Sequence, residues 1–147
     1  MRKIILVDLD HTVSDAFHRD EMIGVCDWDT YHARLEEDDP CWDFISLLEP
    51  LTDRHEVIGL TSRPEKWRRL TMTWLVKHGV CLDDIWMRPD HDYRAAPDVK
   101  IALCKEKLGD EWKENVLFVI DDNERVVAAF KNEGVSVLQI FNRRGRK

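Results

Sequence analysis

The stretch Ile4-Ile5-Leu6-Val7-Asp8-Leu9-Asp10-His11-Thr12 joins four consecutive apolar residues to two aspartates and a threonine. Such a short apolar run cannot span a bilayer, but it suits a strand that is buried on both faces. We therefore expect a strand over residues 3–9. Strands of this kind belong to parallel sheets, in which ligands bind beyond the carboxyl ends of the strands. The acids that follow the run are therefore candidate functional residues.

The rest of the chain repeats this pattern, because short apolar runs alternate with segments of helical periodicity. Further strands are expected over residues 56–61, 85–87, 116–120 and 135–140, and helices over residues 40–49, 64–78, 97–108 and 124–133. Pro50 is expected to end the first helix, and Asp122 or Asn123 to cap the last. The alternation predicts an α/β fold with a parallel sheet covered by helices on both faces. We expect a single domain over residues 1–147, with a short insert at about 13–39.

The composition indicates which partners and which compartment suit the chain. The formal net charge of −7 weighs against non-specific coating of nucleic acid, although it leaves room for a local basic patch. The four cysteines form no C-x-x-C pair and have no histidine at zinc-site spacing, so we interpret them as reduced thiols. No apolar run is long enough for a secretory signal or a membrane span, and we expect a cytoplasmic protein.

The first pair of acids is a weak signal by itself. Asp8 and Asp10 are two residues apart, so at the end of a strand both side chains can face the same side. Two close carboxylates repel each other unless a cation or a shared proton compensates the charge. A D-x-D pair is also typical of solvated acids in a turn, and other residues have to decide between these interpretations.

Further polar residues lie at or near predicted strand ends. They are Thr61-Ser62-Arg63 after the second strand, Asp121-Asp122 after the fourth, and Lys100 in the helix before the fourth. A hydroxyl and a guanidinium can hold phosphoryl oxygens, and adjacent acids after a buried strand can bind a cation. Each group also has an ordinary interpretation. Thr61-Ser62-Arg63 could be a helix cap beside a surface arginine, and Asp122 could cap the next helix. Lys100 could be a solvent-exposed lysine without a specific role.

Together these residues form an ordered set that is far more specific than any one of them. The order D-x-D-x-T at residues 8–12, then Thr61, Lys100 and Asp121-Asp122 resembles the haloacid dehalogenase-like (HAD) superfamily, from residue 4 to about residue 140. The resemblance implies a Rossmann-like three-layer sandwich. It also implies a mainly parallel five-stranded sheet in the order 3-2-1-4-5, with a minimal cap domain or none.

The same resemblance implies a role for each of these residues. Asp8 would attack phosphorus, Asp10 would act as general acid and base, and Thr61 and Lys100 would hold the phosphoryl oxygens. The implied cofactor is Mg²⁺, and its ligands would be Asp8, the backbone carbonyl of Asp10, Asp121 and Asp122.

The residue types agree with this chemistry. A carboxylate nucleophile divides hydrolysis into the formation and the breakdown of an aspartyl-phosphate. A second carboxylate can donate a proton to the departing oxygen and later take one from water. Magnesium prefers hard oxygen ligands, and its charge would allow Asp8 and Asp10 to lie close together. His11 is a departure, because members of the superfamily often carry glycine at this position.

Within the superfamily the chain resembles the 3′-phosphatase domains of phage polynucleotide kinase–phosphatases. Arg19 follows the D-x-D-x-T loop at the matching distance, Arg63 completes a T/S-x-R pattern, and Arg94 precedes Lys100 by the same spacing. The resemblance implies a substrate-binding set of Thr12, Arg19, Ser62, Arg63 and Arg94. It also implies the host cytoplasm as the compartment if the chain is phage-encoded. One departure is that Ala96 and Pro97 stand where those domains carry paired acids.

The expected function is therefore Mg²⁺-dependent hydrolysis of phosphomonoesters through an aspartyl-phosphate, on polynucleotide 3′ ends or on nucleotides. Hydrolysis of free (deoxy)nucleoside monophosphates is the main alternative, which the negative net charge favours. A phospho-accepting receiver domain is a remote alternative. Its phosphorylated aspartate would close the third strand, where this chain has Met87-Arg88-Pro89.

The insert leaves no room for a large cap, so the site should be open, and the family resemblance implies that such a site suits nucleic-acid ends or other bulky phosphomonoesters. Within it, Trp28 or Tyr31 could stack on a base, or both could pack the insert onto the sheet. The sequence contains no kinase P-loop of the form G-x-x-x-x-G-K-[ST]. A kinase or ligase partner would therefore be a separate chain.

Overall fold

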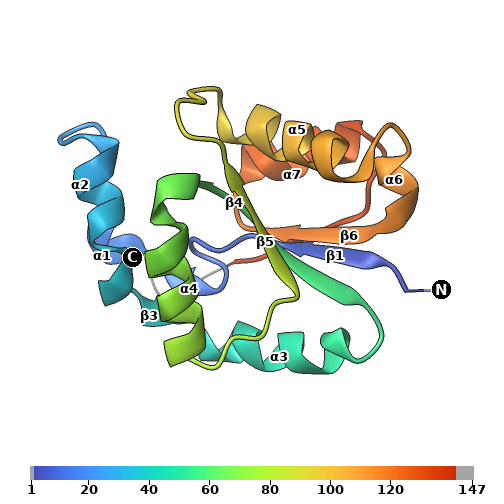
Figure 1. Ribbon diagram of the computed structural model, residues 1–147, viewed down its shortest axis with the longest axis horizontal. Helices are drawn as coiled ribbons and strands as arrows, with labels where there is room; N and C mark the ends of the chain where they lie inside the picture. Colours follow the sequence, from blue (N-terminus) through green and yellow to red (C-terminus); the bar gives the residue numbers. More distant parts are fainter. Residues whose placement is uncertain (1, 142–147) are drawn as a thin grey trace.

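The computed structural model describes residues 2–141, and its centre is a five-stranded parallel sheet (Figure 1). The strands lie in the order β5-β4-β1-β6-β7. Their bounds are β1 Ile4–Val7, β4 Glu56–Pro64, β5 Asp84–Arg88, β6 Val116–Asp121 and β7 Val137–Gln139. This order confirms the predicted arrangement 3-2-1-4-5, and every pairing between these strands is parallel.

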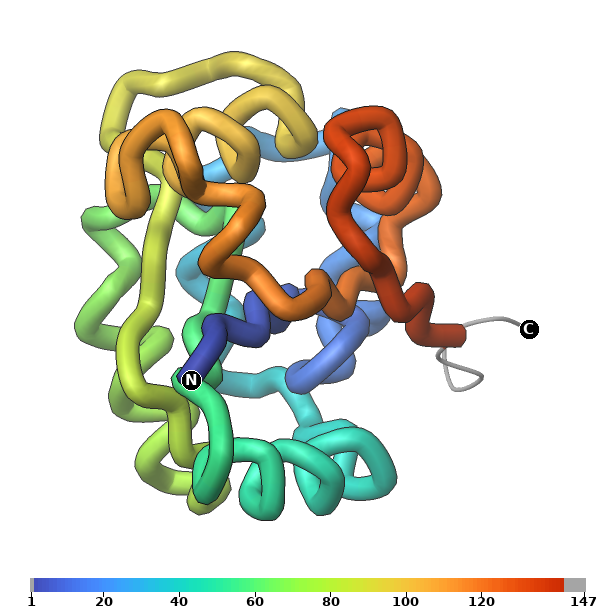
Figure 2. Tube along the Cα trace, turned by 90° about the vertical axis from the view of Figure 1, so that its right-hand side faces the viewer, coloured from blue at the N-terminus to red at the C-terminus, as the bar shows by residue number. Residues whose placement is uncertain are grey.

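Helices cover both faces of the sheet, which makes the fold a three-layer sandwich (Figures 1 and 2). One face carries α3 (Trp42–Thr52) and α4 (Arg68–Lys77), and the other carries α5 (Ala96–Leu108), α6 (Trp112–Asn115) and α7 (Glu124–Asn132). Alternate residues of β1 point into opposite cores, because side chains of a strand alternate between its faces. Ile5 and Val7 belong to the α3–α4 core, and Ile4 and Leu6 to the α5–α7 core. The continuous apolar run of β1 is thereby explained.

The insert between β1 and α3 consists of short elements. They are β2 (Ser14–Asp15), α1 (Phe17–Asp20), α2 (Trp28–Ala33), the 3₁₀ helix η1 (Leu35–Glu37) and β3 (Asp39–Pro40). β2 and β3 pair as a two-stranded antiparallel ribbon. The insert thus carries only short helices and one small ribbon, which agrees with the predicted minimal cap.

Two predicted helix boundaries were wrong. The helix expected to end at Pro50 continues to Thr52, because a proline within the last turn removes only one backbone donor. The helix expected from residue 64 begins later, since β4 continues to Pro64 and the 3₁₀ helix η2 (Glu65–Trp67) precedes α4. The residue before a proline is restricted to extended conformations, so Arg63 remains in the strand.

Other boundaries differ by a few residues. The last strand is shorter than the predicted range 135–140. Asn123 is the residue that caps α7, because its side chain accepts bonds from the backbone N–H groups of Arg125 and Val126. Among the residues that the structure describes, no helix is both long and apolar enough to cross a bilayer.

Candidate active site

The parallel strands bring the predicted residues to one edge of the sheet. Val7 is in register with Gly59 of β4 and with Ile120 of β6. Asp8 follows directly, and its backbone N–H donates to the carbonyl of Ile120 at 2.9 Å. Asp121, which ends β6, therefore lies beside Asp8 at the carboxyl end of the sheet.

Lys100 joins these two acids. Its Nζ donates to Asp8 Oδ1 at 2.8 Å and to Asp121 Oδ2 at 2.6 Å. The lysine comes from the first turns of α5 and is only 2% exposed. Burial disfavours its charged form, but the two carboxylates outweigh this effect and raise the pKa of Lys100. The ammonium group therefore remains charged.

Asp8, Asp121 and Asp122 form an acidic cluster in which one oxygen of each lies within 4.8 Å of the others. Burial, followed by the charge of Asp121, raises the pKa of Asp8 well above its ordinary value, although Lys100 opposes the shift. The cluster thus keeps an excess of negative charge that a cation would relieve. Three carboxylate oxygens are hard ligands of the kind that Mg²⁺ prefers, so the donor set fits this ion. The backbone carbonyl of Asp10 stays a predicted further ligand.

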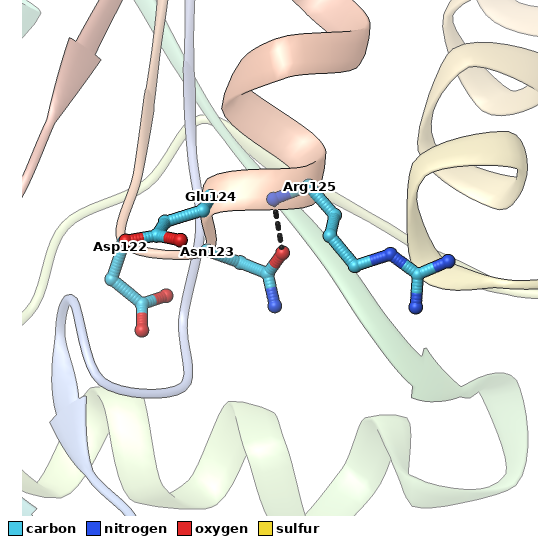
Figure 3. A pocket seen from close by; sticks show the side chains of 4 residues that line it. All are labelled: Asp122, Asn123, Glu124 and Arg125. Carbon is cyan, nitrogen blue, oxygen red and sulfur yellow. Dashed lines mark hydrogen bonds between the residues drawn. The ribbon is translucent and has the colours of Figure 1, made fainter.

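A polar depression of about 330 Å³ opens beside this cluster (Figure 3). It is lined by Asp122, Asn123, Glu124 and Arg125 at the start of α7. The backbone N–H of Arg125 donates to Asn123 Oδ1 at 2.9 Å, so the asparagine is occupied as the helix cap. Asp122 belongs both to the depression and to the acidic cluster, which gives the cluster an approach from solvent.

Asp10 lies in surroundings of opposite charge to those of Asp8, because two arginines bind its carboxylate. Arg19 Nη2 donates to Asp10 Oδ1 at 2.9 Å, and Arg63 donates through Nη2 to Oδ1 at 2.8 Å and through Nε to Oδ2 at 3.2 Å. Burial by itself raises the pKa of Asp10. Arg63 and then Arg19 outweigh burial and hold the pKa well below its usual range.

Asp38 fixes both arginines from behind. Arg19 donates to it through Nε at 2.8 Å and through Nη2 at 2.6 Å, and Arg63 Nη2 lies 3.5 Å from Asp38 Oδ2. The ring of Tyr31 lies 4.6 Å from the Arg19 guanidinium, and His18 Nε2 lies 2.6 Å from Asp38 Oδ1. The insert therefore helps to orient Asp10. Sequence reasoning missed Asp38, because the Asp-Asp-Pro segment around it has no periodicity that marks a buried acid.

The loop after β1 fixes the remaining atoms of Asp8. Thr12 Oγ1 donates to Asp8 Oδ2 at 3.2 Å, and the N–H groups of Thr12, Val13 and Ser14 all donate to the carbonyl of Leu9. His11 has a φ of 65°, the left-handed region that glycine adopts without strain. Histidine is among the other residues that tolerate it, which explains how His11 can replace glycine here.

The other predicted site residues occupy different environments. Thr61 is buried, and its Oγ1 accepts a bond from the Arg63 N–H at 3.1 Å. The carbonyl of Ser62 accepts from Arg88 Nε at 2.8 Å. Arg94 is exposed and donates to Asp92 at 2.8 Å. Arg63 donates to Asp10 and to the hydroxyls of Thr71 and Ser14, and Arg19 donates to carboxylates through Nε and Nη2, while its buried Nη1 has no hydrogen-bond partner among the residues that the structure describes. The substrate-binding role of the two arginines stays a prediction.

Fold and site together define a phosphatase of the HAD type. The model of the polynucleotide kinase PNKP phosphatase domain matches residues 2–144. The chain therefore belongs to this family of HAD-like phosphatases. The expected enzyme class is confirmed, and the alternative of a receiver domain is set aside. No curated protein sequence matches the chain.

Solved structures support the fold. A chain of the Pnkp1/Rnl/Hen1 RNA repair complex superposes with a TM-score of 0.78 at 23% identity, covering 95% of this chain and 42% of that chain. This chain thus spans less than half the length of that relative. L-2-haloacid dehalogenase from Xanthobacter autotrophicus superposes with a TM-score of 0.68 at 14% identity, covering 99% and 80%. A HAD family enzyme from Bacteroides thetaiotaomicron, solved with magnesium and inorganic phosphate, gives 0.61 at 14% identity, covering 98% and 96%.

We predict that Asp38→Asn destabilises the protein by about 3–5 kcal/mol, because it leaves two buried guanidinium groups without their shared counter-charge. Asp39→Asn is the matched control, since Asp39 is the next residue and is exposed. It should change the free energy of unfolding by less than about 0.5 kcal/mol. Urea unfolding measures both values. Equal stabilities of the two variants would contradict the inferred role of Asp38.

We predict that the ion pairs of Asp10 stabilise the fold in a pH-dependent way. The folded-state pKa of Asp10 is lowered, so its contribution is present above the ordinary carboxyl value of 3.8 and is lost as pH falls below it. Asp10→Asn should be less stable than the wild type at neutral pH, and the difference should shrink below about pH 4. Urea unfolding of both proteins from neutral to acidic pH tests this. A difference that grows on acidification would contradict it.

Proposed function

We propose that this phosphatase hydrolyses phosphomonoesters at polynucleotide 3′ ends, with Mg²⁺ as cofactor and Asp8 as nucleophile. The observation that carries the proposal is the contrast between the two acids of one loop. Asp8 is held by Lys100 in an acidic cluster that fits a divalent cation, whereas Asp10 is held by two arginines. Two carboxylates in opposite surroundings suit two different catalytic roles.

In the first step an oxygen of Asp8 attacks phosphorus, and the bond from phosphorus to the ester oxygen breaks. Thr12 and Lys100 each hold one oxygen of Asp8, so the carboxylate is already oriented for attack. Asp10 gives a proton to the departing oxygen. The negative charge of the phosphate raises the proton affinity of Asp10 when substrate is present.

In the second step Asp10 takes a proton from a water molecule, and that water attacks the phosphorus bound to Asp8. The phosphate departs and the Asp8 carboxylate is restored. The lowered pKa of Asp10 suits this step, because the ionised form is the base. The Lys100 ammonium and the Thr61 hydroxyl stabilise the charge of the transferring group. Mg²⁺ bound by Asp8, Asp121, Asp122 and the Asp10 carbonyl would add further neutralisation of that charge.

Free (deoxy)nucleoside monophosphates are the second candidate substrates. The net charge of −7 favours them over a long polyanion, because long-range attraction of a phosphate backbone is weak. Membership of the polynucleotide kinase phosphatase family and the open site support the polynucleotide end. We further propose that residues 1–147 act as one phosphatase domain in the cytoplasm, which is the host's if the chain is phage-encoded. A kinase or ligase partner would lie outside these residues.

We predict Mg²⁺-dependent release of phosphate from a small aryl phosphate, and its loss on addition of EDTA. Asp8→Asn should lower kcat at least ~1000-fold, because the amide is no nucleophile. Asp110→Asn, a change at an exposed aspartate, is the control and should keep full turnover. Near-normal turnover by Asp8→Asn would contradict the assignment of the nucleophile.

We predict that 3′-phosphorylated oligonucleotides are hydrolysed with a higher kcat/KM than 5′-phosphorylated oligonucleotides or 3′- and 5′-mononucleotides. The measurement is phosphate release from all four substrates at one ionic strength, since nucleic-acid affinity depends on salt. A clear preference for free 5′-mononucleotides would overturn the 3′-end assignment in favour of the second candidate.

A further inference from the structure

An exposed tryptophan is presented by α2 at the edge of the molecule where the strands end (Figure 1). Trp28 is 57% exposed, whereas Tyr31 and His32 of the same helix are buried. The Trp28 ring stacks on His32 at 6.0 Å and meets Tyr31 edge-on at 5.3 Å. Burial lowers the pKa of His32 to about 4, so its ring is neutral at pH 7 and supports Trp28 as an uncharged surface. Trp28 is therefore held in place with much of its surface open.

This helix is fixed to the catalytic centre. The Tyr31 ring lies 4.6 Å from the Arg19 guanidinium, and Arg19 itself holds Asp10 at 2.9 Å. Trp28 lies one helical turn before His32. The charges of Asp10 and Arg63 both affect the pKa of His32, so His32 lies close to these two residues. The exposed tryptophan thus has a defined position relative to the general acid.

A second exposed aromatic residue lies in the loop after β5, on the same edge of the sheet (Figure 1). Tyr93 is 83% exposed, and its hydroxyl lies 3.3 Å from His91 Nδ1. Lys66 connects this loop to α2, because its backbone N–H donates to Asp90 at 3.0 Å and its ammonium group pairs with Asp29. Asp29 is the neighbour of Trp28 in sequence, and Tyr93 is close enough to Lys66 to affect its pKa, so Lys66 contacts both of the segments that carry the two aromatic residues.

Three cations of this rim, which consists of α2 with the following Arg34, the loop after β5 and Lys66, are already paired. Lys66 pairs with Asp29, Arg94 with Asp92 at 2.8 Å, and Arg34 with Glu37 at 2.9 Å. A phosphate backbone would have to compete with these carboxylates, and the net charge of the chain is −7. A nucleobase that stacks on the uncharged aromatic rings would not have to compete with these carboxylates. The chemistry of the rim therefore favours nucleobases over phosphodiesters.

We propose that Trp28 and Tyr93 stack on the terminal nucleobases of a single-stranded 3′ end and so place its phosphate at Asp8. Stacking, and not contact with the phosphate backbone, supplies most of the affinity for the nucleic acid. This inference rests on the proposed function, because it names how the same site would recognise its substrate. Stacking tolerates any base sequence, since every base has an aromatic face.

The test is a binding measurement that does not need turnover. Asp8→Asn protein with Mg²⁺ is titrated into a fluorescent, single-stranded oligonucleotide with a 3′-phosphate, and anisotropy reports the Kd. Adding Trp28→Ala should raise the Kd about 10- to 100-fold, whereas Trp28→Phe, which keeps a ring, should retain most of the affinity. Trp42→Ala is the matched control, because Trp42 is 53% exposed on α3. It should leave the Kd unchanged.

An oligonucleotide of the same length that lacks its two terminal bases separates stacking from backbone contact. It should bind the Asp8→Asn protein more weakly than the Trp28→Ala variant binds the normal ligand, because it loses the stacking on both Trp28 and Tyr93, and Trp28→Ala should weaken its binding no further. The dependence of log K on log salt should correspond to no more than about two phosphate contacts, a slope of about −1.4 for a single strand. Tyr93→Ala should weaken binding in the same direction as Trp28→Ala.

Three results would overturn the inference. They are an unchanged Kd for Trp28→Ala, equal affinity for the oligonucleotide that lacks its two terminal bases, and a dependence of log K on log salt that corresponds to four or more phosphate contacts. Thermal unfolding of each variant shows that a change in Kd does not reflect loss of the fold. Failure of the proposed function would be recognised separately. In that case the wild-type protein would release no phosphate from 3′-phosphorylated oligonucleotides, or would clearly prefer free 5′-mononucleotides, whatever the binding experiment shows.

Discussion

The contact of one buried ammonium group with two buried carboxylates is the constraint on which the rest of the site depends. Parallel pairing of β1 with β6 places Asp8 beside Asp121, and two acids in that position would repel each other. Lys100 reaches both at 2.8 and 2.6 Å from α5, so this helix must pack in one position against the sheet. With Asp122 the cluster still has more negative than positive charge, and this balance makes it suited to a cation.

The loop after β1 gives two neighbouring acids opposite electrostatics. Burial and Asp121 raise the pKa of Asp8, whereas Arg63 and Arg19 overcome burial and lower the pKa of Asp10. Two buried arginines would be costly if Asp10 were their only partner, and Asp38 supplies the second carboxylate. The separation of the two environments is what would allow one short loop to hold the proposed nucleophile and the proposed proton carrier.

The insert replaces a cap domain by a few short elements with several tasks. Arg19 and Asp38 belong to it and orient Asp10, and Tyr31 packs on Arg19. The same helix presents Trp28 to solvent. The same insert therefore orients Asp10, the proposed general acid, and carries the tryptophan that we infer to recognise nucleobases. Of the two interpretations of the insert aromatics at the sequence level, packing onto the fold holds for Tyr31, which is buried, whereas base stacking stays a proposal for the exposed Trp28.

The sequence by itself determined the class of fold and the residues that end the strands, because buried parallel strands are continuous apolar runs and polar residues that follow them stand out. Asp8 and Asp121 were found in this way, and Lys100 was found from its place in the helix before β6. Only the tertiary structure decided that Arg19 and Arg63 face Asp10 and that Asp38 lies behind them. Periodicity describes which face of an element is buried, whereas these contacts join residues that are far apart along the chain and depend on how separate elements pack.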